Sequence, residues 1–433
     1  MKIHIIAISC ILAIATLSTA QTPSVHFSAP LTPAAPESVG MSPERLLRLD
    51  RMAQEAIANN QIPGCVVLVA RNGKIVYHKA FGVADTTTGT PLETNSIFRI
   101  ASQTKAITST AVMMLWEEGL FQLDDPISKY IPEFGEKQQI LESYNFEDGT
   151  FTSRPAENRI TIRHLLTHTS GIDYDEITGD KRFRDMYRRA GIVGLFSTKD
   201  ITVGEVVRKL AKLPLRHEPG EKYTYSNGLD VLGYFIEVVS GMPFDEFLRT
   251  RLFDPLGMDD TWFYQPKVNT ERLVTVQRKD ENGDWEPKPV TYYDPAYPIK
   301  GARTFFSGGA GLSSTTEDYA KFLQMYLNGG EYNGIRFLSR KTIESIMMEQ
   351  FPGTWNDKDR SYGLAFGLIG EYGKSRGGRG SVGTFDWGGY FNTQYFADPE
   401  EQLLGLIFKQ TRGKTGDTTR WQYRLLALQA IDD

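Results

Sequence analysis

Strand-like segments stand near both ends of this chain, and helical patterns fill the region between them. An apolar run from Val66 to Ala70 meets a turn at Asn72-Gly73 and a second strand-like segment, Lys74 to Phe81, which predicts a hairpin. Two further strand-like segments, Thr393 to Ala397 and Leu403 to Lys409, come near the other end. This order predicts one interleaved α/β unit with a helical insertion.

Helical periodicity is clearest near the two ends and in the middle of the chain. Ser42-Pro43 is typical of an N-cap followed by proline at the first helical position, and the apolar stripe after it comprises Leu46, Leu49, Met52, Ala53 and Ala56. A second stripe, closed by Gly241, comprises Leu229, Leu232, Phe235, Ile236 and Val239. The final segment, Thr419 to Ile431, is also predicted to be helical.

The first twenty residues have the pattern of a cleavable signal peptide. Lys2 precedes an apolar run from Ile5 to Leu17, and the small residues Ser18-Thr19-Ala20 follow it. The run has thirteen residues, too few to span a bilayer, so no stable membrane anchor is expected after cleavage. We therefore expect cleavage after Ala20 and a periplasmic or secreted protein. Residues 21–37, rich in proline, are predicted to form an extended leader.

The charge argues against a nucleic-acid-binding protein, and the cysteine content argues against a disulfide-stabilised one. The net charge is −5 and no basic stretch occurs, which argues against nucleic acid as a partner. Cleavage would remove Cys10 and leave Cys65 alone, so no internal disulfide can form and stability must come from packing. Cys65 stands in a strand-like apolar run and is expected to be a buried structural thiol.

The segment Ser102-Gln-Thr-Lys105 is the first candidate for chemistry. It opens a predicted helix, where backbone N–H groups and the positive end of the helix dipole suit developing negative charge. Lys105 follows Ser102 by one turn on the same face, so its amine can interact with the serine hydroxyl. A partly desolvated lysine can share its proton and thereby activate this weak nucleophile.

Tyr225-Ser-Asn227 is the second candidate, placed just before the stripe that begins at Leu229. A tyrosine beside a cationic lysine can give up its proton and act as a base. The amide of Asn227 could bind the carbonyl side of a substrate or orient Lys105.

Together these segments resemble the serine β-lactamase and penicillin-binding protein superfamily, most of all class C β-lactamases and the related family VIII carboxylesterases. The matching segments occur in family order: Ile100-Ala-Ser-Gln-Thr-Lys105, Ile162-Arg-His-Leu-Leu-Thr-His-Thr-Ser-Gly171, Pro219-Gly220 with Tyr225-Ser-Asn227, and Gly308-Gly-Ala-Gly-Leu-Ser-Ser314. The resemblance implies a catalytic domain over residues 38–431. It also implies an antiparallel sheet flanked by N- and C-terminal helices, with a mainly helical lobe at roughly 120–300.

The family's third motif, K-T-G or H-T-G on a strand facing the serine, has two candidates. Lys414-Thr-Gly416 fits as a string but leaves too little chain for the hairpin partner that should follow, so Lys414 is expected in a solvated loop. Trp387-Gly-Gly389 has strand-like segments after it and resembles the W-G-G variant of some esterases. We therefore assign the motif to Trp387, Gly388 and Gly389, with the N–H groups of Ser102 and Tyr390 as the implied oxyanion hole.

A zinc site is the main alternative chemistry. His164 and His168 are four residues apart, as in zinc hydrolases, but the glutamate base and a third ligand are missing. Both histidines are expected to be structural and to support the turn at Ser170-Gly171. No metal or cofactor is needed.

The resemblance implies a serine hydrolase that works by double displacement on a small-molecule ester, lactam or peptide. Ser102 would attack a carbonyl while Lys105 and Tyr225 share the role of general base. Because Trp387 stands where the family usually has a cation, an esterase acting on neutral substrates is expected, unless Arg303, Lys374 or Arg379 supplies that cation. A β-lactamase or D-amino-acid peptidase is the alternative, followed by a penicillin-binding protein that is acylated without turnover.

Overall fold

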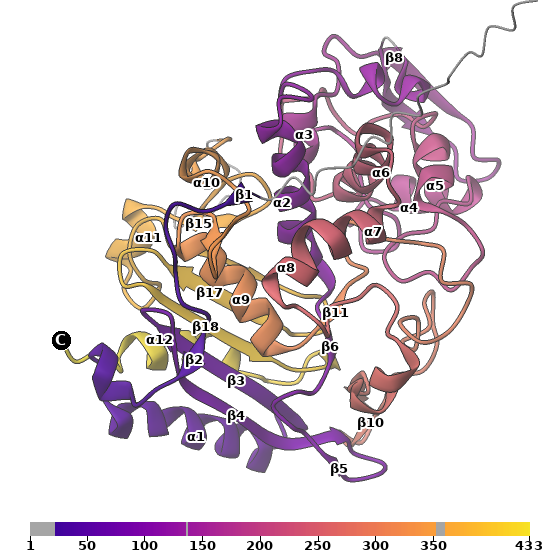
Figure 1. Cartoon of the computed structure of the whole chain (residues 1–433). Helices are drawn as coiled ribbons and strands as arrows, with labels where there is room; N and C mark the ends of the chain where they lie inside the picture. The colour runs from indigo at the N-terminus through magenta and orange to yellow at the C-terminus, as the bar shows by residue number, and fades with distance from the viewer. Residues whose placement is uncertain (1–21, 136, 352–359) are drawn as a thin grey trace, which may run out of the picture.

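The computed structural model describes residues 22–135, 137–351 and 360–433, and one large sheet joins the two ends of the chain (Figure 1). Neighbouring strands in it are antiparallel, except for one short strand near the N-terminus, which pairs in parallel. In spatial order the strands are β14 (Arg360–Tyr362), β15 (Gly367–Ile369), β16 (Phe385–Gly388), β17 (Gln394–Asp398), β18 (Leu403–Phe408), β3 (Gly64–Arg71), β4 (Lys74–Asp85) and β2 (Thr32–Pro33), with β5 (Thr90–Pro91) paired to β4. The predicted antiparallel sheet and both predicted strand pairs are confirmed.

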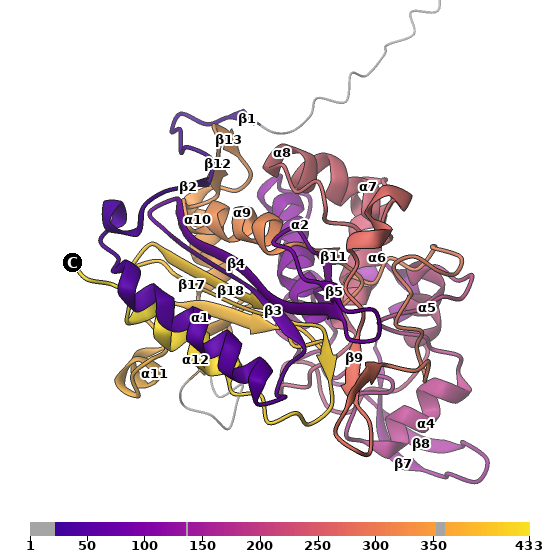
Figure 2. The same cartoon turned by 90° about the horizontal axis from the view of Figure 1, so that it is seen from below.

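Helices cover both faces of this sheet. Figure 2 shows α1 (Pro43–Ala58) and α12 (Thr419–Leu428) side by side on one face, packed against Cys65, Val67 and Val69 of β3. The alternate β3 residues point to the larger core on the other face, which includes α9 (Thr316–Leu327). Cys65 is fully buried, as expected, and burial raises the pKa of its thiol to about 12.

The two predicted helical stripes face the core, although Val239 at the end of the second one is only partly buried. Ser42 caps α1 by accepting the Arg45 N–H, and the five predicted apolar residues are its buried ones. The second stripe lies on α6 (Gly228–Ser240), which ends at Gly241 with φ 71°, the left-handed conformation that glycine favours. Both helices are therefore positioned by capping residues that are visible in the sequence.

The region 120–300 contains most of the remaining helices but is less helical than predicted. Its α-helices are α3 (Ile162–Leu166), α4 (Lys181–Arg189), α5 (Val203–Leu210), α6, α7 (Phe244–Leu248) and α8 (Asp254–Leu256). It also holds a hairpin of β7 (Gln139–Tyr144) and β8 (Phe151–Pro155), and a second pair of β9 (Gln277–Lys279) and β10 (Trp285–Pro287). The β8 side chains are exposed or only partly buried, so no alternating apolar pattern marked that strand.

The remaining α-helices and strands are short, apart from the 14-residue α2. They are β1 (Thr22–Pro23), β6 (Phe98–Arg99), β11 (Ser313–Ser314), β12 (Glu331–Tyr332), β13 (Ile335–Arg336), β19 (Thr411–Arg412), α2 (Thr104–Glu117), α10 (Arg340–Met347) and α11 (Glu371–Ser375). In the predicted leader, β1 pairs with β13 and β2 with β4, so this extended segment is tied to the body. The predicted signal segment lies outside the described residues, and none of the described helices is long and apolar enough to cross a membrane.

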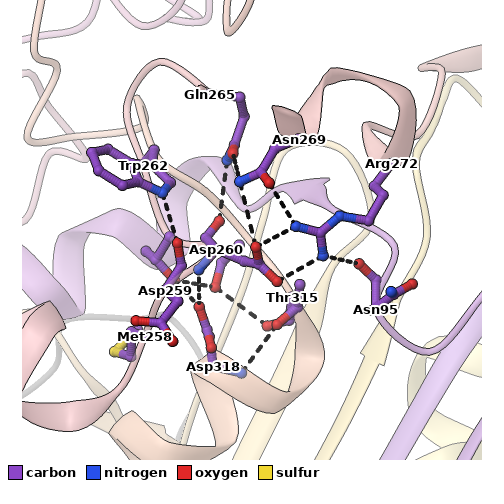
Figure 3. Close-up of polar contacts among 12 residues, drawn as sticks. Asn95, Met258, Asp259, Asp260, Trp262, Gln265, Asn269, Arg272, Thr315 and Asp318 are labelled. Carbon is purple, nitrogen blue, oxygen red and sulfur yellow. Dashed lines mark hydrogen bonds and ion pairs between the residues drawn. The ribbon is translucent and has the colours of Figure 1, made fainter. Parts of the chain in front are cut away.

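A polar network joins the segment after α8 to the start of α9 (Figure 3). Asp318 accepts the Asp260 N–H at 2.9 Å and the Thr261 hydroxyl at 3.0 Å, and its own N–H is capped by Thr315. Arg272 pairs with the Asp260 carboxylate through two nitrogens. The network fixes the end of the helical region against the sheet body.

Candidate active site

Ser102 lies in a short 3-10 turn (Ala101–Gln103) that runs directly into α2. The residue before it, Ala101, has φ 46°, a left-handed conformation rare for a residue other than glycine. Such backbone strain costs about 1–3 kcal/mol and gathers at functional sites. The turn therefore presents the serine at the start of a helix, as predicted.

Lys105 is almost wholly buried, with 1% of its surface exposed. Its Nζ lies 3.4 Å from the Ser102 Oγ, 3.0 Å from the Tyr174 hydroxyl and 2.6 Å from the Gly309 carbonyl oxygen. The lysine is thus directed at the serine rather than at solvent, as the spacing of the two residues predicted.

Tyr225 completes the cluster from the loop before α6. Its hydroxyl lies 2.7 Å from the Ser102 Oγ, and the Lys105 Nζ lies 4.6 Å from the centre of its ring. The phenol donates to Ser102 in this state, and a phenolate could accept the serine proton over the same distance. Tyr225, 123 positions after Ser102, therefore meets Ser102 and Lys105 at one point.

The two histidines have different surroundings, which corrects the expectation that both support the turn at Ser170-Gly171. His164 accepts the Thr161 N–H at 3.3 Å and so caps α3. His168 is fully buried, with its ring centre 4.6 Å from that of Tyr225, and it accepts the Ser226 N–H at 3.2 Å. Burial and the nearby Lys105 hold the pKa of His168 well below its usual value. His168 is therefore a neutral support for the Tyr225 loop, and the described residues contain no group of three metal-ligating side chains.

The position of Asn227 does not support one of its two predicted roles, the orientation of Lys105. It lies just before α6 with 1% of its surface exposed, and its Oδ1 has no hydrogen-bond partner within the described parts of the chain. The partners of the Lys105 amine are Ser102, Tyr174 and the Gly309 carbonyl instead. The geometry does not assign the orientation of Lys105 to Asn227.

The Trp387-Gly-Gly389 segment lies at the end of β16, beside the serine turn. A methyl group on Gly389 would stand 2.5 Å from the Ile100 carbonyl oxygen, so these two backbones are in close contact. The Trp387 ring centre lies 6.1 Å from that of Tyr225. Lys414 is exposed in the loop between β19 and α12, away from any strand.

In comparison with known proteins, residues 49–429 match the model of the Beta-lactamase family. The chain belongs to this family. It is 30% identical over 394 residues to Esterase EstB of Burkholderia gladioli, covering 86% of this chain and 92% of the relative. It is 27% identical over 387 residues to "Putative D-alanyl-D-alanine carboxypeptidase" of Escherichia coli O157:H7, covering 85% and 80%. Among solved structures, EstCE1, a hydrolase with promiscuous acyltransferase activity, superposes with a TM-score of 0.74 at 25% identity, covering 90% of this chain and 99% of the other.

Two groups at the centre of the candidate site were not assigned a role from the sequence. Tyr174 and the Gly309 carbonyl both bind the Lys105 amine. Gly309 stands in one of the segments that carried the resemblance, and Tyr174 follows another by three residues. The segments themselves were therefore a signal, although neither contact could be located from them.

A cavity of about 440 Å³ opens beside Tyr225, Trp387 and Tyr390, and it is rich in arginine. Arg303, Lys374 and Arg379, named above as sources of a missing cation, do not line it. The arginines that do are Arg360, Arg412, Arg420 and Arg424. Arg360 and Arg424 share the Asp386 carboxylate. Arg412 lies 3.5 Å from the centre of the Tyr390 ring and donates to the Tyr390 carbonyl at 3.0 Å.

Proposed function

We propose that this Beta-lactamase family member is a secreted or periplasmic serine esterase that works through an acyl-enzyme. The observation that carries the proposal is the position of the Ser102 Oγ, 2.7 Å from the Tyr225 hydroxyl and 3.4 Å from the Lys105 amine. A serine placed between two groups that can exchange its proton is the arrangement that nucleophilic catalysis needs.

In the proposed reaction, Ser102 attacks the ester carbonyl and its proton passes to the Lys105–Tyr225 pair. The N–H groups of Ser102 and Tyr390 stabilise the oxyanion. Collapse of the tetrahedral intermediate expels the alcohol, which takes up that proton. Water then attacks the acyl-enzyme by the same route and releases the acid and the free serine.

The residues on the substrate side of the site favour a neutral ester as the first candidate substrate and an acidic molecule as the second. Trp387 and its aromatic neighbours offer an apolar wall to a neutral ester, and EstB is named as an esterase. The arginines of the cavity favour the second candidate, a β-lactamase or D-amino-acid peptidase, because their substrates carry a carboxylate. A protein acylated by penicillin-like ligands without turnover is the third.

Replacing the serine tests the mechanism. Ser102→Ala should abolish turnover while leaving the melting temperature within a few degrees. A fluorophosphonate probe should label the wild type at Ser102, located by peptide mass spectrometry. Labelling at another residue, or an active alanine variant, would remove Ser102 from the mechanism.

A substrate panel on the mature protein tests the substrate class. Short-chain p-nitrophenyl esters should give a higher kcat/KM than nitrocefin or a D-Ala-D-Ala peptide. Nitrocefin as the best substrate would favour the β-lactamase, and a burst without turnover would indicate a penicillin-binding protein. N-terminal sequencing of the protein exported by a bacterial host should begin at Gln21 if cleavage follows Ala20.

A further inference from the structure

Asp230 is a buried carboxylate directly behind the candidate active site. It lies in the first turn of α6 with 2% of its surface exposed. Its Oδ1 accepts the Ser307 hydroxyl at 2.6 Å and the Gly309 N–H at 3.0 Å, whereas its Oδ2 has no hydrogen-bond partner among the described residues. Two neutral donors compensate poorly for burying an ionised carboxylate, which therefore needs a cation nearby.

Lys105 supplies that cation, and Gly309 is hydrogen-bonded to both Lys105 and Asp230. The Gly309 carbonyl accepts the Lys105 amine at 2.6 Å, while its N–H donates to Asp230. A methyl group built on Gly309 would stand 3.3 Å from both Asp230 carboxylate oxygens and 3.2 Å from the Tyr174 hydroxyl. The carboxylate and the tyrosine that binds Lys105 therefore both lie against this glycine.

The segment that carries Gly309 is held between two helices. On the α2 side, the Thr108 hydroxyl donates to the Gly308 carbonyl at 2.7 Å. On the α6 side, a methyl group on Gly308 would stand 2.3 Å from the Leu229 carbonyl oxygen, and Asp230 binds the next residue. Asp230 is thus the polar anchor of the segment on the α6 side.

We propose that Asp230 is a positioning residue for Lys105, one that holds the Gly309 carbonyl against the amine and balances its positive charge. The inference rests on the proposed serine mechanism, in which Lys105 exchanges a proton with Ser102. Asp230 itself does not contact the serine in any hydrogen bond of the described residues.

Other titratable groups surround Lys105 and limit what a pH profile can report. Burial raises the pKa of Tyr174 and of Tyr223 well above 10, and the pKa of His168 is well below its usual value, so all three stay neutral near pH 7. Burial also raises the pKa of Asp175 to about 6. Burial raises the pKa of Asp230, and the hydrogen bonds from Ser307 and Gly309 and the charge of Lys105 offset part of that rise. Above the range of Asp175, activity should therefore follow the Lys105–Tyr225 pair as one coupled unit.

Asp230→Asn tests the proposal because it removes the charge and keeps an oxygen that can accept from Gly309. The pH dependence of Ser102 labelling by a fluorophosphonate, and of kcat/KM for a p-nitrophenyl ester, should be measured on both proteins. Without the carboxylate the positive charge at Lys105 loses its balancing partner, so the limb of the pH profile should move to lower pH. We also expect kcat to fall by about tenfold or more with little change in KM.

Ser307→Ala is the matched control, since it removes a donor to the same Asp230 oxygen and leaves the charge in place. The limb of its pH profile should stay at the same pH as in the wild type. A folded Asp230→Asn variant whose limb does not move would overturn the proposal, even if its kcat falls. If that variant does not fold, Asp230→Ser applies the same test, because it also removes the charge; an unmoved limb there also overturns the proposal. Failure of the serine mechanism would appear separately, as wild-type labelling away from Ser102.

Discussion

Tyr225 contacts Ser102 through one hydroxyl oxygen, while its ring is held by several other neighbours. The hydroxyl lies 2.7 Å from the Ser102 Oγ, and the ring centre lies 4.6 Å from that of His168 and 5.4 Å from that of Tyr174. Removing only the oxygen should therefore leave the ring in place. Its chemical contribution can be measured without disturbing the packing.

Tyr225→Phe should lower kcat by about a hundredfold to ten-thousandfold, the usual contribution of a positioned acid or base. The melting temperature should change little. Tyr234→Phe is a suitable control because it removes another hydroxyl, bound to Arg208 at 2.8 Å on the outer part of α6. A Tyr225→Phe variant with near-normal kcat would leave Lys105 as the sole base.

The two glycines after Trp387 differ in what surrounds them. A methyl group on Gly389 would stand 2.2 Å from the Thr393 hydroxyl oxygen and 2.5 Å from the Ile100 carbonyl oxygen. A methyl group on Gly388 would meet the side chain of Gln394, with 2.9 Å to its Nε2. A flexible side chain can move aside, whereas the Ile100 backbone next to the serine turn cannot.

Gly389→Ala should accordingly reduce kcat/KM by about a hundredfold, and Gly388→Ala by much less. Lys414→Ala should change the free energy of unfolding by no more than about 0.5 kcal/mol and leave kcat/KM unchanged. Steady-state assays of the three variants beside wild type decide the point. Strong damage from Lys414→Ala would return the third motif to Lys414-Thr-Gly416.

At the scale of single elements, features that depend only on neighbouring residues could be predicted from the sequence. The α1 helix carries its N-cap, its proline and its apolar stripe in consecutive residues, and all of them act as expected. Ser102 and Lys105 lie one helical turn apart, so their proximity followed from spacing alone. The β8 strand has a largely exposed surface and carries no such pattern.

Contacts between distant elements could not be predicted in the same way. The Lys105 amine and the Gly309 carbonyl are separated by 204 positions, and the carbonyl belongs to the backbone, which no residue type reveals. The arginines of the cavity come from β14, β19 and α12, so only the folded chain brings them together. From the sequence, Arg303, Lys374 and Arg379 were named instead, since they lie closer to the known motifs along the chain.

The junction between the α8 segment and α9 should respond to pH through Asp318. Burial raises the pKa of this carboxyl to about 6, above its ordinary value of 3.8. A group with a raised pKa in the folded state stabilises the fold below its unfolded pKa, and that contribution is lost as pH rises through 6. Ionised Asp318 should therefore weaken the folded state above this pH.

Asp318→Asn should raise the free energy of unfolding at pH 8 by about 3 kcal/mol, less the cost of any weakened hydrogen bond. The gain should shrink as pH falls toward 4. Urea unfolding at both pH values measures it, and Glu317→Gln, an exposed neighbour in the same helical turn, should show no such pH dependence. A gain that grows on acidification would contradict the assignment.

For the molecule as a whole, the C-terminal helix is part of the core. Tyr423, Ala427 and Ala430 are buried against the same face of the sheet as α1. A chain ending at Thr418 should therefore fail to accumulate as folded protein. A chain lacking only Asp432 and Asp433 should fold, since it loses partly exposed ion pairs with Arg45 and Arg71 that contribute about 1 kcal/mol or less each. Soluble yield and thermal melting compare the two truncations.

The pairing of β18 with β3 also determines the order in which the protein can be made. Arg71 and Glu401, 330 positions apart, are hydrogen-bonded where these two strands pair. The strand β16 and its glycines belong to the part of the chain that is made after β3 and β4. Until the last part of the chain is made, the apolar strand β3 has one unpaired edge, which slows folding and favours aggregation. The helical region also depends on the end of the chain, because β9 pairs with β19. Catalytic competence is thus expected to be the final property acquired during synthesis, and a chaperone that shields the early hairpin should raise the yield of active protein.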